Sequence, residues 1–66
     1  MNREQVGKRL KKLRGKRRIV EVANALGITK QAVYFYETGR RMPKDNMKSA
    51  IAEYYGKSVQ DIFFAE

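Results

Sequence analysis

Small and apolar residues in the segment 19–36 follow the spacing of two short helices joined by a tight turn. Counted from Ile19, alanine is fifth, glycine ninth, an aliphatic residue fifteenth and a large apolar residue eighteenth: Ala23, Gly27, Val33 and Tyr36. A small residue lets two helices cross closely, and glycine adopts the positive φ of a tight turn at little cost. The segment therefore predicts a compact helix pair that the rest of the chain must pack around.

The length and the residue types exclude several kinds of protein. The chain has 66 residues, so we expect one domain over residues 1–66. It contains no cysteine and no histidine, which excludes disulfides and the usual zinc sites. No apolar run approaches the roughly 18 residues of a membrane span, and the first residues lack the apolar stretch of a signal peptide. We expect a cytoplasmic protein without a membrane segment, a metal or another cofactor.

Positive charge is concentrated at the start of the chain. The net charge is +8. Residues 1–18 contain nine basic side chains and one acidic side chain, whereas residues 19–66 contain six of each. This asymmetry favours a polyanionic partner such as a nucleic acid. The alternative is a solvated helix face that keeps a small protein in solution.

Capping residues and glycines divide the chain into helical segments. Asn2 can cap a first helix that Gly15 ends, and Thr29 can cap a third helix that Gly39 ends. The apolar residues recur at helical spacings throughout, and no segment alternates as a strand would. We expect an all-α fold of five short helices around one core: between Asn2 and Gly15, about 19–26, about 30–38, from 44 or 45 to 55, and a short one after Ser58.

The motifs resemble those of a lambda-repressor-like helix-turn-helix domain of the XRE or Cro/C1 type. The resemblance covers nearly the whole chain, from about Val6 to Phe63, and rests on three groups of residues: Val22-Ala23-x-x-Leu26-Gly27-Ile28-Thr29, Val33-x-x-Tyr36-Glu37-x-Gly39-Arg40-x-x-Pro43, and Ile51-Ala52-x-x-Tyr55-Gly56-x-Ser58-x-x-Asp61-Ile62-Phe63. It implies a five-helix domain with the helix-turn-helix unit at helices two and three. Known members are mostly bacterial and phage transcription regulators, and many bind palindromic operators as homodimers.

The resemblance also implies a structural ion pair between the first and third helices. Arg14 stands where the family usually carries arginine, and Glu37 stands where it usually carries the partner. An arginine can meet a carboxylate with two parallel hydrogen bonds, which would fix one helix against the other. Two unrelated surface charges are the alternative.

The third helix is the candidate for reading DNA, because helix-turn-helix units place their second helix in the major groove. Gln31 can bond an adenine edge, and Lys30 can donate to guanine O6 and N7. Phe35 is one turn after Gln31 and could contact a thymine methyl group. Partial burial is the alternative for the aromatic residues. The candidates for base readout are Lys30, Gln31, Tyr34 and Phe35.

A second group of residues is expected to hold the DNA backbone. The free amides at the start of the second helix suit a phosphate. Family members often carry a phosphate-binding glutamine at the first position of that helix, where this chain has Ile19. We expect Arg18 to supply the contact instead. Solvated charges are the alternative for the arginines. The backbone candidates are Arg17, Arg18, Thr29, Thr38, Arg40 and Arg41.

These residues favour a sequence-specific regulator of transcription, with repression as its expected role, that binds a palindromic double-stranded DNA operator as a homodimer. The candidates for the dimer contact are Tyr55, Phe63 and Phe64, which would otherwise complete the monomer core. The alternative function is a protein-interaction module, such as an antitoxin or an accessory subunit. The sequence lacks a carboxylate cluster and a phosphate-cradling glycine loop, so we expect no enzyme and no small-molecule ligand.

Overall fold

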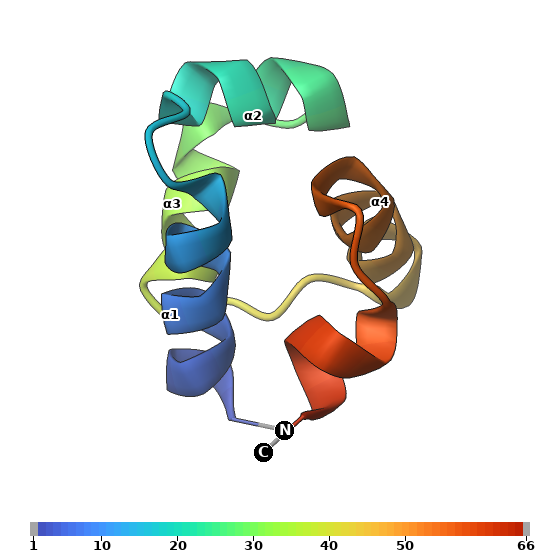
Figure 1. The fold of residues 1–66 in the computed structure, drawn as a ribbon. Coiled ribbons are helices and arrows are strands. Elements are labelled where there is room, and N and C mark those ends of the chain that lie inside the picture. Colours follow the sequence, from blue (N-terminus) through green and yellow to red (C-terminus); the bar gives the residue numbers. More distant parts are fainter. Residues whose placement is uncertain (1, 66) are drawn as a thin grey trace.

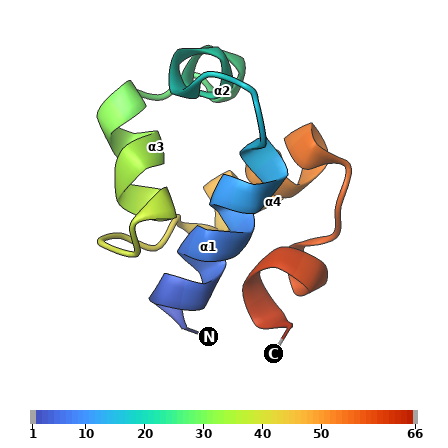
Figure 2. The ribbon, with the colours of Figure 1, turned by 60° about the vertical axis from the view of Figure 1, so that its left-hand side comes forward.

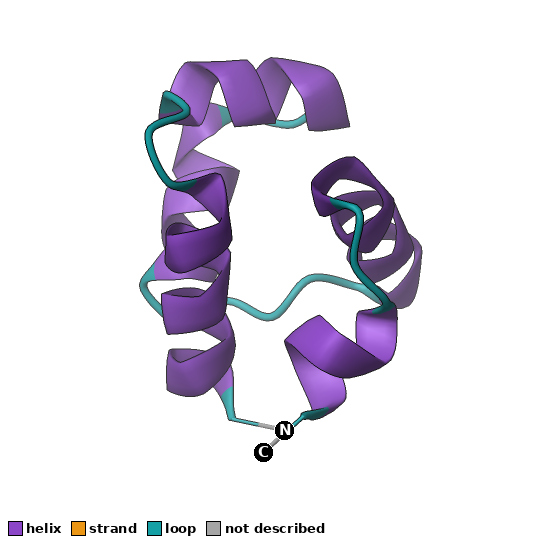
Figure 3. Ribbon diagram, in the orientation of Figure 1, coloured by secondary structure: helices purple, strands orange, loops and turns teal. Residues whose placement is uncertain are grey.

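Five helices form the part of the chain that the structure describes, as the sequence predicts. The structure is a computed structural model that describes residues 2–65, and this part of the chain contains helices and loops without strands (Figure 3). The first four helices are α-helices and the fifth is a short π-helix: α1 (Arg3–Arg14), α2 (Ile19–Leu26), α3 (Lys30–Glu37), α4 (Asp45–Tyr55) and η1 (Gln60–Phe64). The expected all-α class is therefore confirmed, and the α-helices begin and end within a residue or so of where the sequence predicts.

Local hydrogen bonds explain where the helices begin and end. The side chain of Asn2 accepts from the first amides of α1, and the hydroxyl of Thr29 accepts from the amide of Ala32 at the start of α3. Gly27 follows α2 with a left-handed φ of 70°, and the amide of Ile28 then donates to the carbonyl of Ala23. The tight turn between α2 and α3 is thus a glycine turn, because a side chain would strain this backbone.

The helices enclose two adjoining groups of buried side chains. The larger group lies among α1, α4 and η1 and consists of Val6, Leu10, Ile51, Ala52, Ile62 and Phe63. The smaller group belongs to the helix-turn-helix unit and consists of Val22, Ala23 and Val33. Leu26 and Tyr55 pack against both groups, so the two form one continuous core.

Helix α1 runs through the middle of this arrangement. Figure 1 shows α2 across one end of the molecule, and Figure 2 shows α1 between α3 on one side and η1 on the other. Helix α1 packs against α3 of the helix-turn-helix unit and against η1 of the C-terminal segment. It therefore positions α3 relative to the rest of the domain.

The crossing of α1 and α3 is close because α1 carries a glycine there. A Cβ atom at Gly7 would lie 2.6 Å from the carbonyl oxygen of Glu37 and 2.9 Å from that of Tyr36. The atoms in the way are backbone atoms, which cannot rotate aside. The sequence analysis did not single out Gly7, since nothing in its neighbourhood along the chain reveals what it faces.

We predict that Gly7→Ala destabilises the protein, although alanine is favoured over glycine inside a helix by about 1 kcal/mol. The methyl group must push α1 and α3 apart, and overpacking of this kind typically costs about 1–3 kcal/mol. Thermal unfolding followed by circular dichroism should show a melting temperature below that of the wild type. The control is Lys8→Ala, a neighbouring exposed position. A Gly7→Ala protein that melts at or above the wild-type temperature would contradict the close crossing.

Candidate nucleic-acid interface

The first turn of α3 presents two polar side chains to solvent. Lys30 and Gln31 are exposed, whereas Val33 on the opposite side of the helix is buried in the core. The hydroxyl of Thr29 is occupied by the amide of Ala32 at 3.0 Å, which fixes the helix start. Lys30 and Gln31 are therefore carried by a helix whose start and buried face are both held in place.

Two aromatic side chains continue this face toward the end of α3. Tyr34 is 47% exposed, and Phe35 is half-buried. Their ring centroids are 6.2 Å apart, with the planes tilted by 49°. Together the two rings make this part of α3 more apolar than its first turn.

The arginines after α3 gather around Phe35. The guanidinium carbon atoms lie 6.0 Å (Arg40) and 5.4 Å (Arg41) from the centroid of its ring. Thr38 is also exposed, but its hydroxyl donates to the carbonyl of Tyr34 at 2.8 Å. The hydroxyl oxygen of Thr38 can still accept a hydrogen bond. Arg40 and Arg41 are both exposed.

The basic residues before α2 have different surroundings. Arg18 is exposed at the N-cap of α2 and makes no side-chain capping bond. Arg17 donates to the carbonyl of Leu13 at 3.0 Å, and its guanidinium lies 5.7 Å from the ring of Tyr54 and 5.6 Å from that of Tyr55. Arg18 thus stands free beside the first amides of α2, while Arg17 is stacked on α4.

Ile19 is half-buried and packs against the core group of the helix-turn-helix unit. The side chain that departs from the family's usual glutamine therefore contributes an apolar contact. An aliphatic side chain offers a phosphate no hydrogen bond.

A nearly buried ion pair joins the end of α1 to the end of α3. Arg14 donates through Nε to Oε2 of Glu37 at 2.8 Å and through a terminal nitrogen to Oε1 at 3.1 Å. A further nitrogen of Arg14 donates to the carbonyl of Arg17 at 2.8 Å. The Arg14 side chain is 16% exposed and that of Glu37 is 6% exposed. These are the two residues that the family resemblance pairs, and they meet in the two-pronged geometry.

The ion pair influences the titration of its neighbours. Hydrogen bonding to Glu37 raises the pKa of Arg14 above its ordinary value, so its charge is secure. Burial is the main cause that raises the pKa of Tyr55 from 10.0 to about 12, and the nearby Glu37 carboxylate adds to it. Tyr55 is thus held in its neutral form beside the ion pair.

The three candidates for a dimer contact occupy different places. Tyr55 is half-buried between the two core groups. Phe64 is 47% exposed, with the ammonium of Lys48 5.5 Å from its ring. Phe63 is 1% exposed. The expectation that Phe63 offers a surface to a second copy is therefore wrong, because its ring fills the core beneath α1 and α4.

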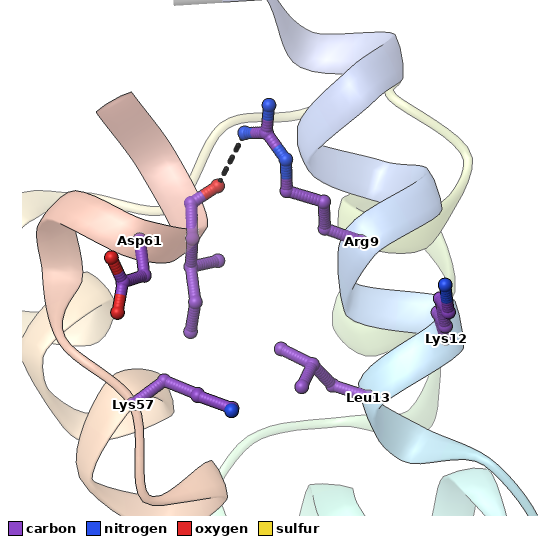
Figure 4. Close-up of a pocket in the computed structure, with 6 residues that line it drawn as sticks. Arg9, Lys12, Leu13, Lys57 and Asp61 are labelled. Atoms are coloured by element: carbon purple, nitrogen blue, oxygen red, sulfur yellow. Dashed lines mark hydrogen bonds between the residues drawn. The ribbon is translucent and has the colours of Figure 1, made fainter. Parts of the chain in front are cut away.

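A surface hollow of about 530 Å³ lies on another side of α1, away from the helix-turn-helix unit (Figure 4). Its walls come from α1 and the C-terminal segment: Arg9, Lys12, Leu13, Lys57, Asp61 and Ile62. Arg9 donates to the carbonyl of Ile62 at 2.8 Å and also to that of Ala65, so it ties η1 to α1. The sequence analysis missed this role, because the bonded residues are more than 50 positions apart.

No three metal-binding side chains of the described residues gather into a potential metal site. Likewise, none of the described helices has the length and apolar character needed to cross a membrane.

Comparisons with known proteins gave one finding. A family model described as helix-turn-helix matches residues 8–62, which is most of the chain. Neither the curated proteins nor the solved structures gave a match. The matched span includes α2, the glycine turn and α3, together with the ion pair that holds them.

We predict that breaking the Arg14–Glu37 pair strongly destabilises the protein. Removing one member of a buried pair leaves the other charge without a partner, which typically costs about 3–5 kcal/mol. Chemical denaturation of Arg14→Met and of Glu37→Gln should show this loss, and the double variant should lose less than the sum of the two. The control is Asp45→Asn, which removes a fully exposed carboxylate 3.6 Å from the buried Lys48 and should cost about 1 kcal/mol or less. Two near-neutral single variants would rule out a structural role.

We also predict that Tyr55 makes the protein less stable at alkaline pH. Its pKa is higher in the folded protein than in the unfolded chain, so the neutral side chain favours the fold below about pH 10. As the pH rises from 10 toward 12, ionisation favours the unfolded chain, and this contribution is lost. The free energy of unfolding should fall more steeply over this range for the wild type than for Tyr55→Phe. Parallel pH curves for the two proteins would refute the shift.

Proposed function

The chain belongs to the Cro/C1-type helix-turn-helix family of DNA-binding transcription regulators, and we propose that it is a sequence-specific repressor that reads the major groove with α3. The observation that carries the proposal is the exposed first turn of α3. Lys30 and Gln31 stand there on a capped helix whose opposite face is anchored in the core. A major groove about 12 Å wide admits such a helix, and its base edges offer partners to both side chains.

The proposed roles divide the surface into reading residues, which contact base edges, and gripping residues, which contact the DNA backbone. Lys30 and Gln31 donate to base edges, and the exposed ring of Tyr34 lies along the same helix. Arg18 reaches a phosphate beside the uncapped amides of α2, a site to which the helix dipole also attracts anions. Thr29 and Thr38, at the two ends of α3, contact the DNA backbone in this proposal. Arg17, stacked over α4, contributes mainly through its charge.

We propose that two copies bind a palindromic operator together. Recognition helices of a symmetric dimer lie about 34 Å apart, one turn of DNA. The exposed ring of Phe64 and the half-buried side chain of Tyr55 are the surfaces proposed for the contact between copies. In this role the protein acts in the cytoplasm on chromosomal or phage DNA, with neither catalysis nor a cofactor.

A selection of binding sites from random duplex DNA tests the proposal. We expect the wild-type protein to enrich one motif made of two inverted half-sites, with centres about 10–10.5 base pairs apart. A single unrepeated half-site would remove the dimer from the proposal. Failure to enrich any motif would overturn sequence-specific regulation.

Variants in the same experiment separate reading from gripping. Gln31→Ala should relax the preference at one base pair of each half-site by about 1–3 kcal/mol. Arg18→Ala should weaken binding to all duplexes alike and reduce the salt dependence, because one counterion fewer is released. The control is Lys57→Ala, which removes an exposed charge beyond α4 and should leave both properties nearly unchanged. If Gln31→Ala left every base preference intact, Gln31 would not read the operator.

A further inference from the structure

The ring of Phe35 holds two positive charges at once. Arg40 and Arg41 approach it with guanidinium carbons 6.0 and 5.4 Å from its centroid. Both distances are within the range in which an aromatic face attracts a cation. The ring is half-buried, so it is itself held by the domain rather than free to move.

The backbone keeps the arginines at this ring. The carbonyl of Phe35 accepts from the amide of Arg40 at 2.9 Å and from that of Arg41 at 3.3 Å. Gly39 makes the turn possible with a φ of 76°, and a Cβ there would lie 3.2 Å from the backbone of Arg3. The turn is therefore packed against the start of α1. Phe35 thus binds the same two residues through its carbonyl and through its ring.

Within the described part of the chain, neither guanidinium group has an acidic partner. Among residues 2–65, the carboxylates within 4 Å of a basic group belong to Glu37 and Asp45, which pair with other residues. Two like charges near one ring repel each other, and the ring only partly offsets this cost. An anion that binds both groups would relieve the repulsion. Guanidinium groups suit phosphate oxygens, to which they can donate two parallel hydrogen bonds.

We propose that Phe35 is a positioning residue that presents Arg40 and Arg41 to the phosphodiester backbone of DNA, and that it does not read a base. This inference rests on the proposed function. It replaces the expectation of a thymine contact, because the arginines occupy the surroundings of the ring. Phe35 lies four residues after Gln31, about 6 Å further along the helix axis. The arginines therefore grip the backbone at the far end of the face that reads bases.

A double-mutant cycle on DNA of arbitrary sequence tests the inference. The probe is a 24-base-pair duplex, with binding measured over a series of salt concentrations. Removing both arginines (Arg40→Ala with Arg41→Ala) should weaken binding and lower the salt slope by up to about two. Phe35→Leu should weaken binding several-fold, whereas Phe35→Tyr, which keeps the ring, should bind like the wild type. In the background without the arginines, Phe35→Leu should have no further effect.

Two results would overturn the proposal. One is an equal effect of Phe35→Leu with and without the arginines, provided that thermal melting shows both proteins folded. The other is a change of preference at a single base pair of the selected motif, since that is the signature of a base contact. If Phe35→Leu does not fold, the wild-type resonances of Arg40 and Arg41, compared with that of Arg18 as described below, still decide, because the absence of a ring-current shift would overturn the proposal.

A measurement without DNA separates this inference from the proposed function. In the free protein, the ring current of Phe35 should shift the side-chain N–H resonances of Arg40 and Arg41, and Phe35→Leu should remove the shift. The resonance of Arg18 serves as the control. If the wild type binds no duplex DNA, the proposed function fails, whatever the resonances show. If it binds DNA but the arginine resonances are the same in wild type and Phe35→Leu, the positioning role fails alone.

Discussion

The arrangement of this domain depends on the contact between the end of α1 and the end of α3. Arg14 and Glu37 form a two-pronged ion pair, and Gly7, about two turns before Arg14 on α1, lets the two backbones approach closely. Arg14 also donates to the carbonyl of Arg17, so the same guanidinium holds the segment that leads into α2. One side chain therefore sets the position of α3 and the entry to α2. A 66-residue chain buries few side chains, which makes a fixed polar contact of this kind valuable for keeping α3 in one orientation.

This contact has a direct bearing on the proposed interface. The helix-turn-helix unit has a small core of its own, Val22, Ala23 and Val33, and a helix of eight residues is marginal by itself in water. Recognition of base edges requires that Lys30 and Gln31 keep their positions relative to the gripping arginines. The ion pair, the cap at Thr29 and the turn packed on α1 each restrain α3 at a different point. The reading face is thus carried by a short helix that its neighbours hold rigid.

Local signals in the sequence were sufficient to predict the helices, and non-local contacts were not predictable in the same way. Asn2, Thr29 and the glycines act on backbone within a few residues, so the helix ends follow from them. Gly7, Arg9 and the arginines at Phe35 acquire their roles from partners that the fold brings near, and no spacing reveals those partners. Phe63 and Phe64 illustrate the same limit. Adjacent aromatic residues point in different directions, and the π-helical turn decides that Phe63 is the buried one.

Ile19 shows how the departure from the family pattern is accommodated. Its side chain adds an apolar contact to a core group that has few members, while a phosphate-binding side chain at the start of α2 is given up. Arg18 stands one residue earlier and makes no capping bond, so its charge and the free amides of α2 remain beside each other. At the opposite end of the unit, Phe35 keeps two more guanidinium groups without acidic partners among the described residues. Under the proposed function, arginines that flank the helix-turn-helix unit contact the DNA backbone, in place of the uncharged glutamine that family members carry within α2. Charged contacts to phosphates release counterions. The binding of this chain to DNA should therefore depend on salt more steeply than that of a relative that contacts the same phosphate through an uncharged glutamine.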